Sequence, residues 1–194
     1  MVEKLREQEM TGREIQRVYC MNDGAERSFV VRADKDVAVT VAFDLEGMVL
    51  LCRQFRPGQE RFVDDPPGGM AEPGEDPETT AARELLEETG YEARELMRVC
   101  AHPMVTNSTR TVYGFLARGC KRVAEPALDD GEHIELVRKP LPEFVQQVAR
   151  GLVSDYGAAQ AALLRELVPM LGDGERAAFA AMQLQVLAGL PLSQ

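Results

Sequence analysis

One stretch, from residue 56 to residue 90, most strongly limits what this chain can fold into. Residues 56–77, RPGQERFVDDPPGGMAEPGEDP, are rich in Gly, Pro and Asp, which predicts a loop with little regular structure, long enough to suggest function. A helix is predicted directly after it. Asp76 is a good N-cap, Pro77 suits the first helical position, and Gly90 is a good terminator.

This helix has two different sides, an apolar one and an acidic one. The side expected to be buried comprises Ala81, Ala82, Leu85, Leu86 and Thr89. Glu84, Glu87 and Glu88 share another side, because spacings of three and four bring side chains together. Like charges four residues apart repel by roughly 0.2–0.5 kcal/mol, so this side is either solvated surface or the site of a cation.

Three details favour a cation site over plain surface. Oxygen ligands suit Mg²⁺ or Mn²⁺, and a divalent cation would offset the repulsion between the carboxylates. Arg83 lies four residues before Glu87 and can therefore pair with it. The turn Pro67-Gly68-Gly69 lets the backbone approach a ligand without obstruction by side chains. Carboxylates, exposed backbone and bound cations together indicate a place for a diphosphate.

The rest of the chain alternates predicted strands with helices. Residues 15–33 favour a hairpin of two strands around Asn22-Asp23-Gly24. Further strands are predicted at 37–44, 48–55, 96–101, 111–117 and 133–138. Further helices are predicted at 142–150, 155–170 and 174–188. This order indicates a mixed sheet with helices packed on it, which is an α/β fold class.

Charge and cysteine usage exclude several classes of protein. The formal net charge is −10 and no basic stripe is present, which argues against binding nucleic acid or anionic membranes. The first ten residues do not resemble a secretory signal, and no apolar run is long enough to span a membrane. Cys20, Cys52, Cys100 and Cys120 form no CxxC pair, so we expect reduced, buried thiols in a cytoplasmic protein.

The acidic helix and its loop also resemble a known signature. Gly69 is followed after five residues by Glu75, then after seven by Arg83-Glu84-Leu85, and after one by Glu87-Glu88, with Gly90-Tyr91 beyond. This pattern resembles the complete motif of the Nudix hydrolases. The resemblance implies a Nudix-type α/β/α sandwich over residues 37–194, preceded by a β-hairpin extension over residues 1–36. It also implies metal-dependent hydrolysis of a nucleoside diphosphate linked to another group.

The resemblance assigns roles residue by residue. Glu84, Glu87 and Glu88 would be metal ligands, together with the backbone carbonyl of Gly69. Arg83 would orient Glu87, and Glu75 would brace the loop. A carboxylate must take the proton of the attacking water, and three glutamates stay open for this role: Glu88, Glu132 in the late acidic loop, and Glu135 three residues further on.

A second stretch indicates the subgroup. Arg53-Gln54-Phe55-Arg56 resembles the RQYR segment of ADP-ribose and nucleotide-sugar pyrophosphatases, in which Arg56 would pair with a phosphate. Arg53 alternates to the other side of its strand, where it would bind substrate or form a structural salt bridge. Members of this subgroup usually dimerise, with the N-terminal strands helping to form the partner's pocket, so the resemblance implies a homodimer.

Two departures bear on the substrate. Asp65 stands where the family usually has Glu before its glycine turn, and Asn107 and Arg110 stand in a loop that would contact substrate or shape a turn. We therefore expect hydrolysis of ADP-ribose or a related nucleoside diphosphate sugar. The alternatives are a nucleoside triphosphate or dinucleoside polyphosphate hydrolase, and a non-catalytic sugar-nucleotide sensor.

Overall fold

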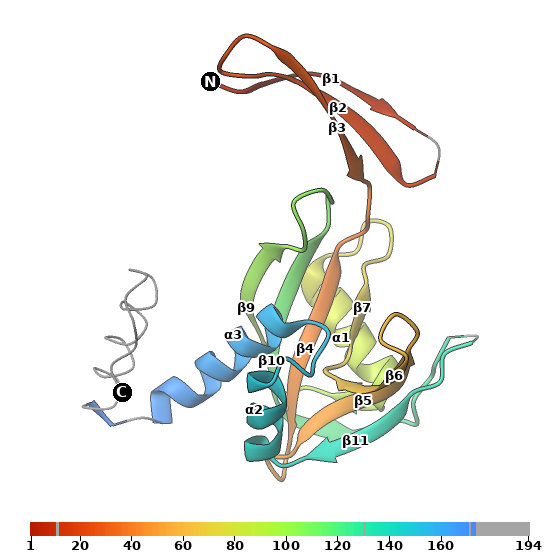
Figure 1. Cartoon of the computed structure of the whole chain (residues 1–194). Coiled ribbons are helices and arrows are strands. Elements are labelled where there is room, and N and C mark those ends of the chain that lie inside the picture. The colour runs from red at the N-terminus through yellow and green to blue at the C-terminus, as the bar shows by residue number, and fades with distance from the viewer. Residues whose placement is uncertain (11, 130, 171, 174–194) are drawn as a thin grey trace.

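The computed structural model describes residues 1–10, 12–129, 131–170, 172 and 173. It contains a small sheet at the N-terminus and a larger mixed sheet with helices on both faces, as Figure 1 shows. The predicted helix at 174–188 lies outside the described residues. No described helix has both the length and the apolar character needed to cross a lipid bilayer.

The N-terminal sheet has three antiparallel strands: β1 (Glu3–Glu9), β2 (Glu14–Cys20) and β3 (Glu26–Arg32). The predicted hairpin is confirmed as β2 and β3, joined by a turn in which the Gly24 N–H donates to the Met21 carbonyl. The third strand, β1, was not predicted. All of its residues are exposed, so it lacks the apolar alternation that identifies a half-buried strand.

The large sheet has the strand order β11-β5-β4-β10-β8, with β6, β7 and β9 pairing beside β5, β4 and β10. Among the described strand pairs of this sheet, β4–β10 is parallel and the others are antiparallel, so the predicted mixed sheet is confirmed. The strands are β4 (Val37–Asp44), β5 (Val49–Arg56), β6 (Arg61–Asp65), β7 (Gly68–Met70), β8 (Tyr91–Glu92), β9 (Glu95–Pro103), β10 (Thr111–Arg122) and β11 (Glu135–Lys139).

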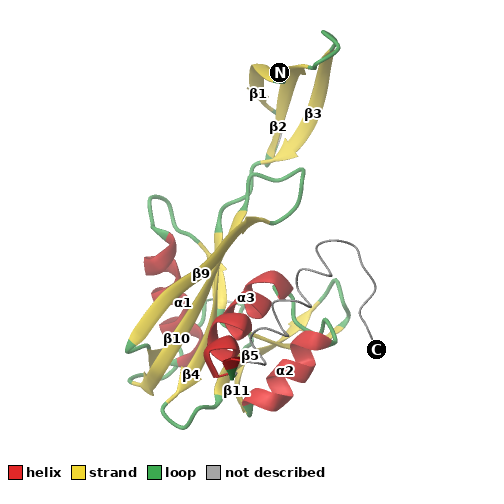
Figure 2. Cartoon of the chain, turned by 90° about the vertical axis from the view of Figure 1, so that its left-hand side faces the viewer, coloured by secondary structure: helices red, strands yellow, loops and turns green. Residues whose placement is uncertain are grey.

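The central strands are apolar on both faces, and this places helices on each side of the sheet. Val41 and Phe43 of β4 pack with α2 (Leu141–Ala149) and α3 (Tyr156–Leu167). A short 3₁₀ turn, Val168–Met170, follows α3 directly. Ala42 faces the other way and packs with Leu85 of α1 (Pro77–Thr89). Figure 2 shows α1 on one side of the sheet and α2 and α3 on the other. The α/β/α sandwich is therefore confirmed.

The region 56–77 is more regular than predicted. Two short strands lie within it, β6 paired with β5 and β7 paired with β4. Local composition hid them because their backbone hydrogen bonds go to distant partners and their charges are paired across the ladder. Arg53 faces Asp64 in this register, and their side chains form two hydrogen bonds.

The four cysteines are free thiols. Cys52 and Cys120 are buried as expected, whereas Cys20 and Cys100 are only partly buried.

Candidate active site

The acidic helix α1 begins and ends where its capping residues predict. The Asp76 carboxylate accepts hydrogen bonds from the backbone N–H groups of Glu78 and Thr79, at 3.0 and 3.1 Å. Gly90 ends the helix in the left-handed conformation with φ of 76°, and its N–H donates to the Leu86 carbonyl. The caps fix where the helix begins and ends, and packing of its apolar side against the sheet sets the direction in which its carboxylates point.

The buried side of α1 differs in part from the prediction. Ala81, Leu85 and Thr89 are buried, but Ala82 is exposed and Leu86 only half-buried. Glu88 is buried instead, because α1 turns this edge toward β5 and β7. The three glutamates Glu84, Glu87 and Glu88 still line one cleft together.

Arg83 lies at the centre of the acidic side and binds three carboxylates. Its Nε and Nη2 donate to the two carboxylate oxygens of Glu75, at 2.9 and 3.0 Å. Its Nη1 donates to Glu84 at 2.9 Å and to Glu87 at 2.8 Å, so the predicted contact with Glu87 is present. The Met70 carbonyl accepts a further bond from Nη2. One guanidinium thus holds the helix, the loop before it and β7 in a fixed relation.

These carboxyl groups have different pKa values because their surroundings differ. The hydrogen bonds from Arg83 lower the pKa of Glu75 to about 2. Burial raises the pKa of Glu84, although Arg83 opposes the shift. Burial also raises the pKa of Glu88 to about 7, against hydrogen bonds from the Gly68 N–H and the Cys52 thiol. Glu84 and Glu88 are therefore carboxylates whose ionised form a nearby cation would stabilise.

The glutamates line a cleft of about 400 Å³ that also contains residues from other elements. Gly68 and Gly69 of β7 form one wall, and a Cβ added to Gly69 would collide with the Glu84 carboxylate. Arg56 of β5 enters from the sheet, and Glu132 enters from the loop before β11. A neighbouring pocket of about 410 Å³ shares Arg56, Gly68 and Gly69 with the cleft.

The donor set of the cleft fits Mg²⁺ or Mn²⁺. Its side-chain donors are carboxylate oxygens, and the backbone of Gly69 lies directly against Glu84. In the part of the chain that the structure describes, no three His, Cys, Asp or Glu side chains form a complete ligand cluster by themselves. The fit therefore rests on oxygen chemistry and on the desolvation of Glu84 and Glu88.

The structure separates the three candidates for the general base. Glu132 lines the cleft with the helix glutamates, and its carboxylate accepts a hydrogen bond from the Asp129 N–H at 3.3 Å. Glu135 is on β11 and lines an adjacent hollow that Glu132 also borders; 70% of the Glu135 side chain is exposed, and Arg53 lies at 4.0 Å. Glu88 and Glu132 thus share the cleft, and Glu135 lies outside it.

The two arginines of the RQFR segment point to opposite sides of the sheet. Arg56 lines both the cleft and its neighbouring pocket, while Arg53 faces away and pairs with Asp64 at 2.7 Å. Asp65, a predicted substrate contact, is 2% exposed and accepts bonds from Arg56, the Ser154 hydroxyl and the Ser154 N–H. Asp65 thus holds Arg56 in place.

The late loop contributes Arg110 but not Asn107 to this region. The Arg110 Nε donates to the Lys35 carbonyl at 2.7 Å, and its side chain lines the neighbouring pocket. Asn107 lies by the N-terminal sheet, where its carbonyl accepts a hydrogen bond from the Arg32 N–H. Asn107 lines a separate pocket beside that sheet.

The sequence analysis gave no role in the site to several residues that line the cleft or contact its glutamates: Lys35, Cys52, Gln54, Met70, Glu72 and Ala127. Strand periodicity could have found two of them, because Cys52, Gln54 and Arg56 alternate onto one face of β5. No local signal marks Lys35, which reaches the cleft only through the fold.

Comparison with known proteins identifies the family. Residues 34–150 match the family model of the NUDIX domain. The chain is 34% identical over 142 residues to the ADP-ribose pyrophosphatase of Bacillus subtilis (strain 168), covering 72% of this chain and 76% of that protein. It is 30% identical over 128 residues to the methanol dehydrogenase activator of Bacillus methanolicus, covering 65% and 69%.

A solved structure shares the fold. The crystal structure of an ADP compounds hydrolase matches with a TM-score of 0.69 at 20% sequence identity, covering 89% of this chain and 94% of the other. With the complete loop–helix motif in place, the chain belongs to the Nudix family of pyrophosphohydrolases.

Proposed function

We propose that this protein hydrolyses the pyrophosphate bond of ADP-ribose, or of a related nucleoside diphosphate sugar, to a nucleoside monophosphate and a sugar phosphate. The observation that carries the proposal is one cleft in which three helix glutamates, Glu132 and Arg56 meet. The pocket beside it provides space for the groups attached to the diphosphate. The name of the Bacillus subtilis relative supports ADP-ribose as the first substrate to test.

The proposed roles follow from the surroundings of each residue. Glu84, Glu87, Glu88 and the carbonyl of Gly69 would hold Mg²⁺ or Mn²⁺. When bound, such a cation neutralises phosphate charge and lowers the pKa of a coordinated water. Arg83 keeps the glutamates in position.

The remaining groups act on substrate. Arg56 and Arg110 bind its phosphates, and Arg56 is already oriented by Asp65. In the hydrolytic step, a water oxygen bonds to phosphorus, the bridging P–O bond breaks, and a carboxylate takes the proton of the water. Glu132 is the favoured base because it faces the helix glutamates, while one oxygen of Glu88 already accepts two hydrogen bonds.

We also propose that the protein works as a cytoplasmic homodimer without nucleic-acid partners. Four free cysteines suit a reducing compartment, and the net charge of −10 disfavours nucleic acid. The N-terminal sheet exposes apolar side chains, including Phe29 and Val30, that suit contact with a second copy.

The test is a substrate panel with Mg²⁺ that includes ADP-ribose, ADP- and GDP-sugars, NADH, nucleoside triphosphates and dinucleoside polyphosphates. We expect AMP and ribose 5-phosphate from ADP-ribose, and loss of turnover in EDTA. Binding without turnover would indicate a sensor, and preference for triphosphates would replace the proposed substrate class.

Variants test the assignment of residues. Glu87→Gln and Glu88→Gln should remove activity, and Glu132→Gln should reduce kcat by about 10²–10⁴-fold, as expected for loss of a general base. Glu78→Gln is the matched control, because this exposed glutamate lies on the same helix outside the cleft. Full activity in Glu87→Gln or Glu88→Gln would refute the metal-ligand assignment.

A further inference from the structure

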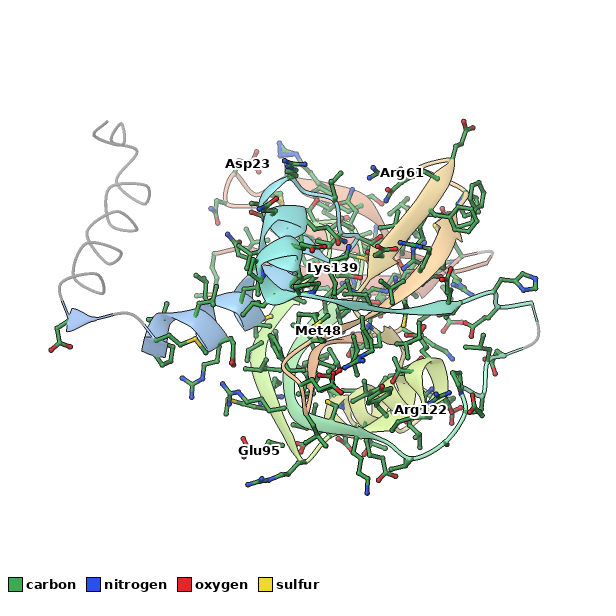
Figure 3. The ribbon with its side chains drawn as sticks, turned by 90° about the horizontal axis from the view of Figure 1, so that it is seen from below. Asp23, Met48, Arg61, Glu95, Arg122 and Lys139 are labelled. Carbon is green, nitrogen blue, oxygen red and sulfur yellow. The ribbon has the colours of Figure 1, made fainter. Side chains whose placement is uncertain are left out.

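A second hollow lies on the side of the sheet that carries α2, away from the cleft. It is formed by β6, β11 and α2, and its volume is about 630 Å³. Figure 3 labels Arg61 and Lys139, which enter this region from β6 and β11. We call it the α2 groove. Its volume is within the range of about 300–1,000 Å³ that is usual for small-molecule sites.

The α2 groove carries more positive than negative charge in a strongly acidic protein. Four cationic side chains line it, against two carboxylates, Asp64 and Glu143. The four are Arg53, Arg61, Lys139 and Arg150. A local excess of cations is notable because the whole chain has a formal net charge of −10. Such a groove attracts anions.

Two of these cations share one carboxylate, and the other two form no ion pair within the described residues. Asp64 binds Arg53 at 2.7 Å and Lys139 at 3.0 Å, which also fixes the inner wall of the groove. Within the described part of the chain, the Arg61 side chain donates to a neutral group, the Gln59 side-chain oxygen, at 3.1 and 3.0 Å. Arg150 forms no ion pair with any side chain of the described ranges.

The available groups define the class of ligand. A guanidinium presents paired N–H donors that match phosphate oxygens, and Arg61 and Arg150 provide two. Phe62 also lines the groove and is 68% exposed, so it offers an apolar surface to an organic group. We propose that the α2 groove binds a small phosphomonoester, with its phosphate on Arg61 and Arg150 and its organic part on Phe62.

This proposal stands apart from the proposed catalytic function, and its test requires no turnover. Binding of AMP, ribose 5-phosphate, adenosine and ribose would be measured by titration calorimetry in EDTA, so that no divalent cation assists binding in the cleft. The decisive variant is Arg61→Gln/Arg150→Gln. The matched control is Arg27→Gln/Arg122→Gln, which removes the same charge from exposed arginines elsewhere.

We expect saturable binding of at least one phosphomonoester, with affinity weakened about tenfold or more in the groove variant and unchanged in the control. Binding of AMP alone would identify a nucleotide ligand, and equal binding of ribose 5-phosphate would assign recognition to the sugar phosphate. Absence of binding, equal affinity for adenosine and AMP, or full affinity in the groove variant would each overturn the proposal.

Discussion

The glutamates around Arg83 show how one residue type takes on different tasks. Glu75 accepts two hydrogen bonds from the guanidinium and stays ionised over the ordinary pH range, because its pKa is lowered to about 2. Glu88 is buried against β5 and β7, and its pKa is raised to about 7. The first is suited to hold Arg83, and the second to receive a cation that restores its ionised form.

The low pKa of Glu75 predicts a dependence of stability on pH. In the unfolded chain, Glu75 binds a proton as the pH falls below its ordinary pKa of 4.5. In the folded protein, Glu75 stays ionised until the pH approaches its lowered pKa of about 2. The stability contributed by this group is therefore complete above pH 4.5 and is lost as the pH falls toward 2. Glu75→Gln should lower the free energy of unfolding by about 1–2 kcal/mol at pH 7.

The measurement is urea unfolding of the wild type and Glu75→Gln in EDTA across this pH range. The difference between the two proteins should shrink as the pH falls through the window, because the wild-type carboxylate becomes protonated. A difference that stays constant to pH 2 would contradict the role given to the Glu75–Arg83 pair.

Gly69 is predicted to contribute to activity because of its contact with Glu84. A Cβ at this position would collide with the Glu84 carboxylate and displace it from the cleft. Gly69→Ala should reduce kcat by about 10–100-fold, the range found when groups that orient metal ligands are changed. Activity would be measured against Mg²⁺ concentration, with circular dichroism as the control for folding. Unchanged activity at limiting Mg²⁺ would exclude this role.

At the scale of elements, the C-terminal cap of α1 links the motif to the rest of the sheet. Gly90 has φ of 76°, and an added Cβ would meet the Ala124 carbonyl. Gly90→Ala should therefore combine backbone strain with a collision, and destabilise the protein by about 2–3 kcal/mol. The matched control is Gly47→Ala, where φ is 78° but no atom lies within 4 Å, so about 1 kcal/mol is expected.

Chemical denaturation of both glycine variants measures this difference directly. The collision accounts for the additional loss in Gly90→Ala, since the backbone conformation is nearly the same at the two positions. Equal losses in the two variants would show that Ala124 moves away without cost.

Elements with local signals could be predicted, and elements stabilised by distant partners could not. Asp76, Pro77 and Gly90 mark the ends of α1 within the helix itself. By contrast, β6 and β7 form only because β5 and β4 supply their hydrogen bonds, and the sequence of β1 is polar throughout.

The same distinction applies to the candidate site. The contact of Arg83 with Glu87 follows from helical spacing alone. Placing Glu132 in the cleft and Glu135 outside it required knowledge of where β11 begins, because the two residues are only three positions apart. The partner of Arg56 also depended on the fold, since Asp65 comes from the adjacent strand β6.

At the scale of the whole molecule, β1, β2 and β3 form a sheet separate from the sheet of the α/β/α sandwich. The sheet of β1, β2 and β3 extends away from the sandwich, as Figure 1 shows, and the proposed boundary at residue 36 falls between β3 and β4. They meet where Arg32 exchanges backbone hydrogen bonds with Asn107 and Thr109. Part of the apolar surface of this sheet is buried and part is exposed, and the exposed part is available for contact with another molecule.

From the exposed apolar side chains on that sheet, we predict that it contacts a second copy of the chain. Phe29 and Val30 are 41% and 47% exposed, although they belong to residue types that are usually buried. Sedimentation equilibrium should give twice the chain mass of 21.5 kDa. Phe29→Asp/Val30→Asp should shift the mass toward 21.5 kDa, whereas Leu45→Asp, at an exposed apolar residue in the β4–β5 turn, should not. A wild-type mass of 21.5 kDa at every concentration would rule out the dimer and show that the exposed apolar side chains of this sheet do not cause self-association.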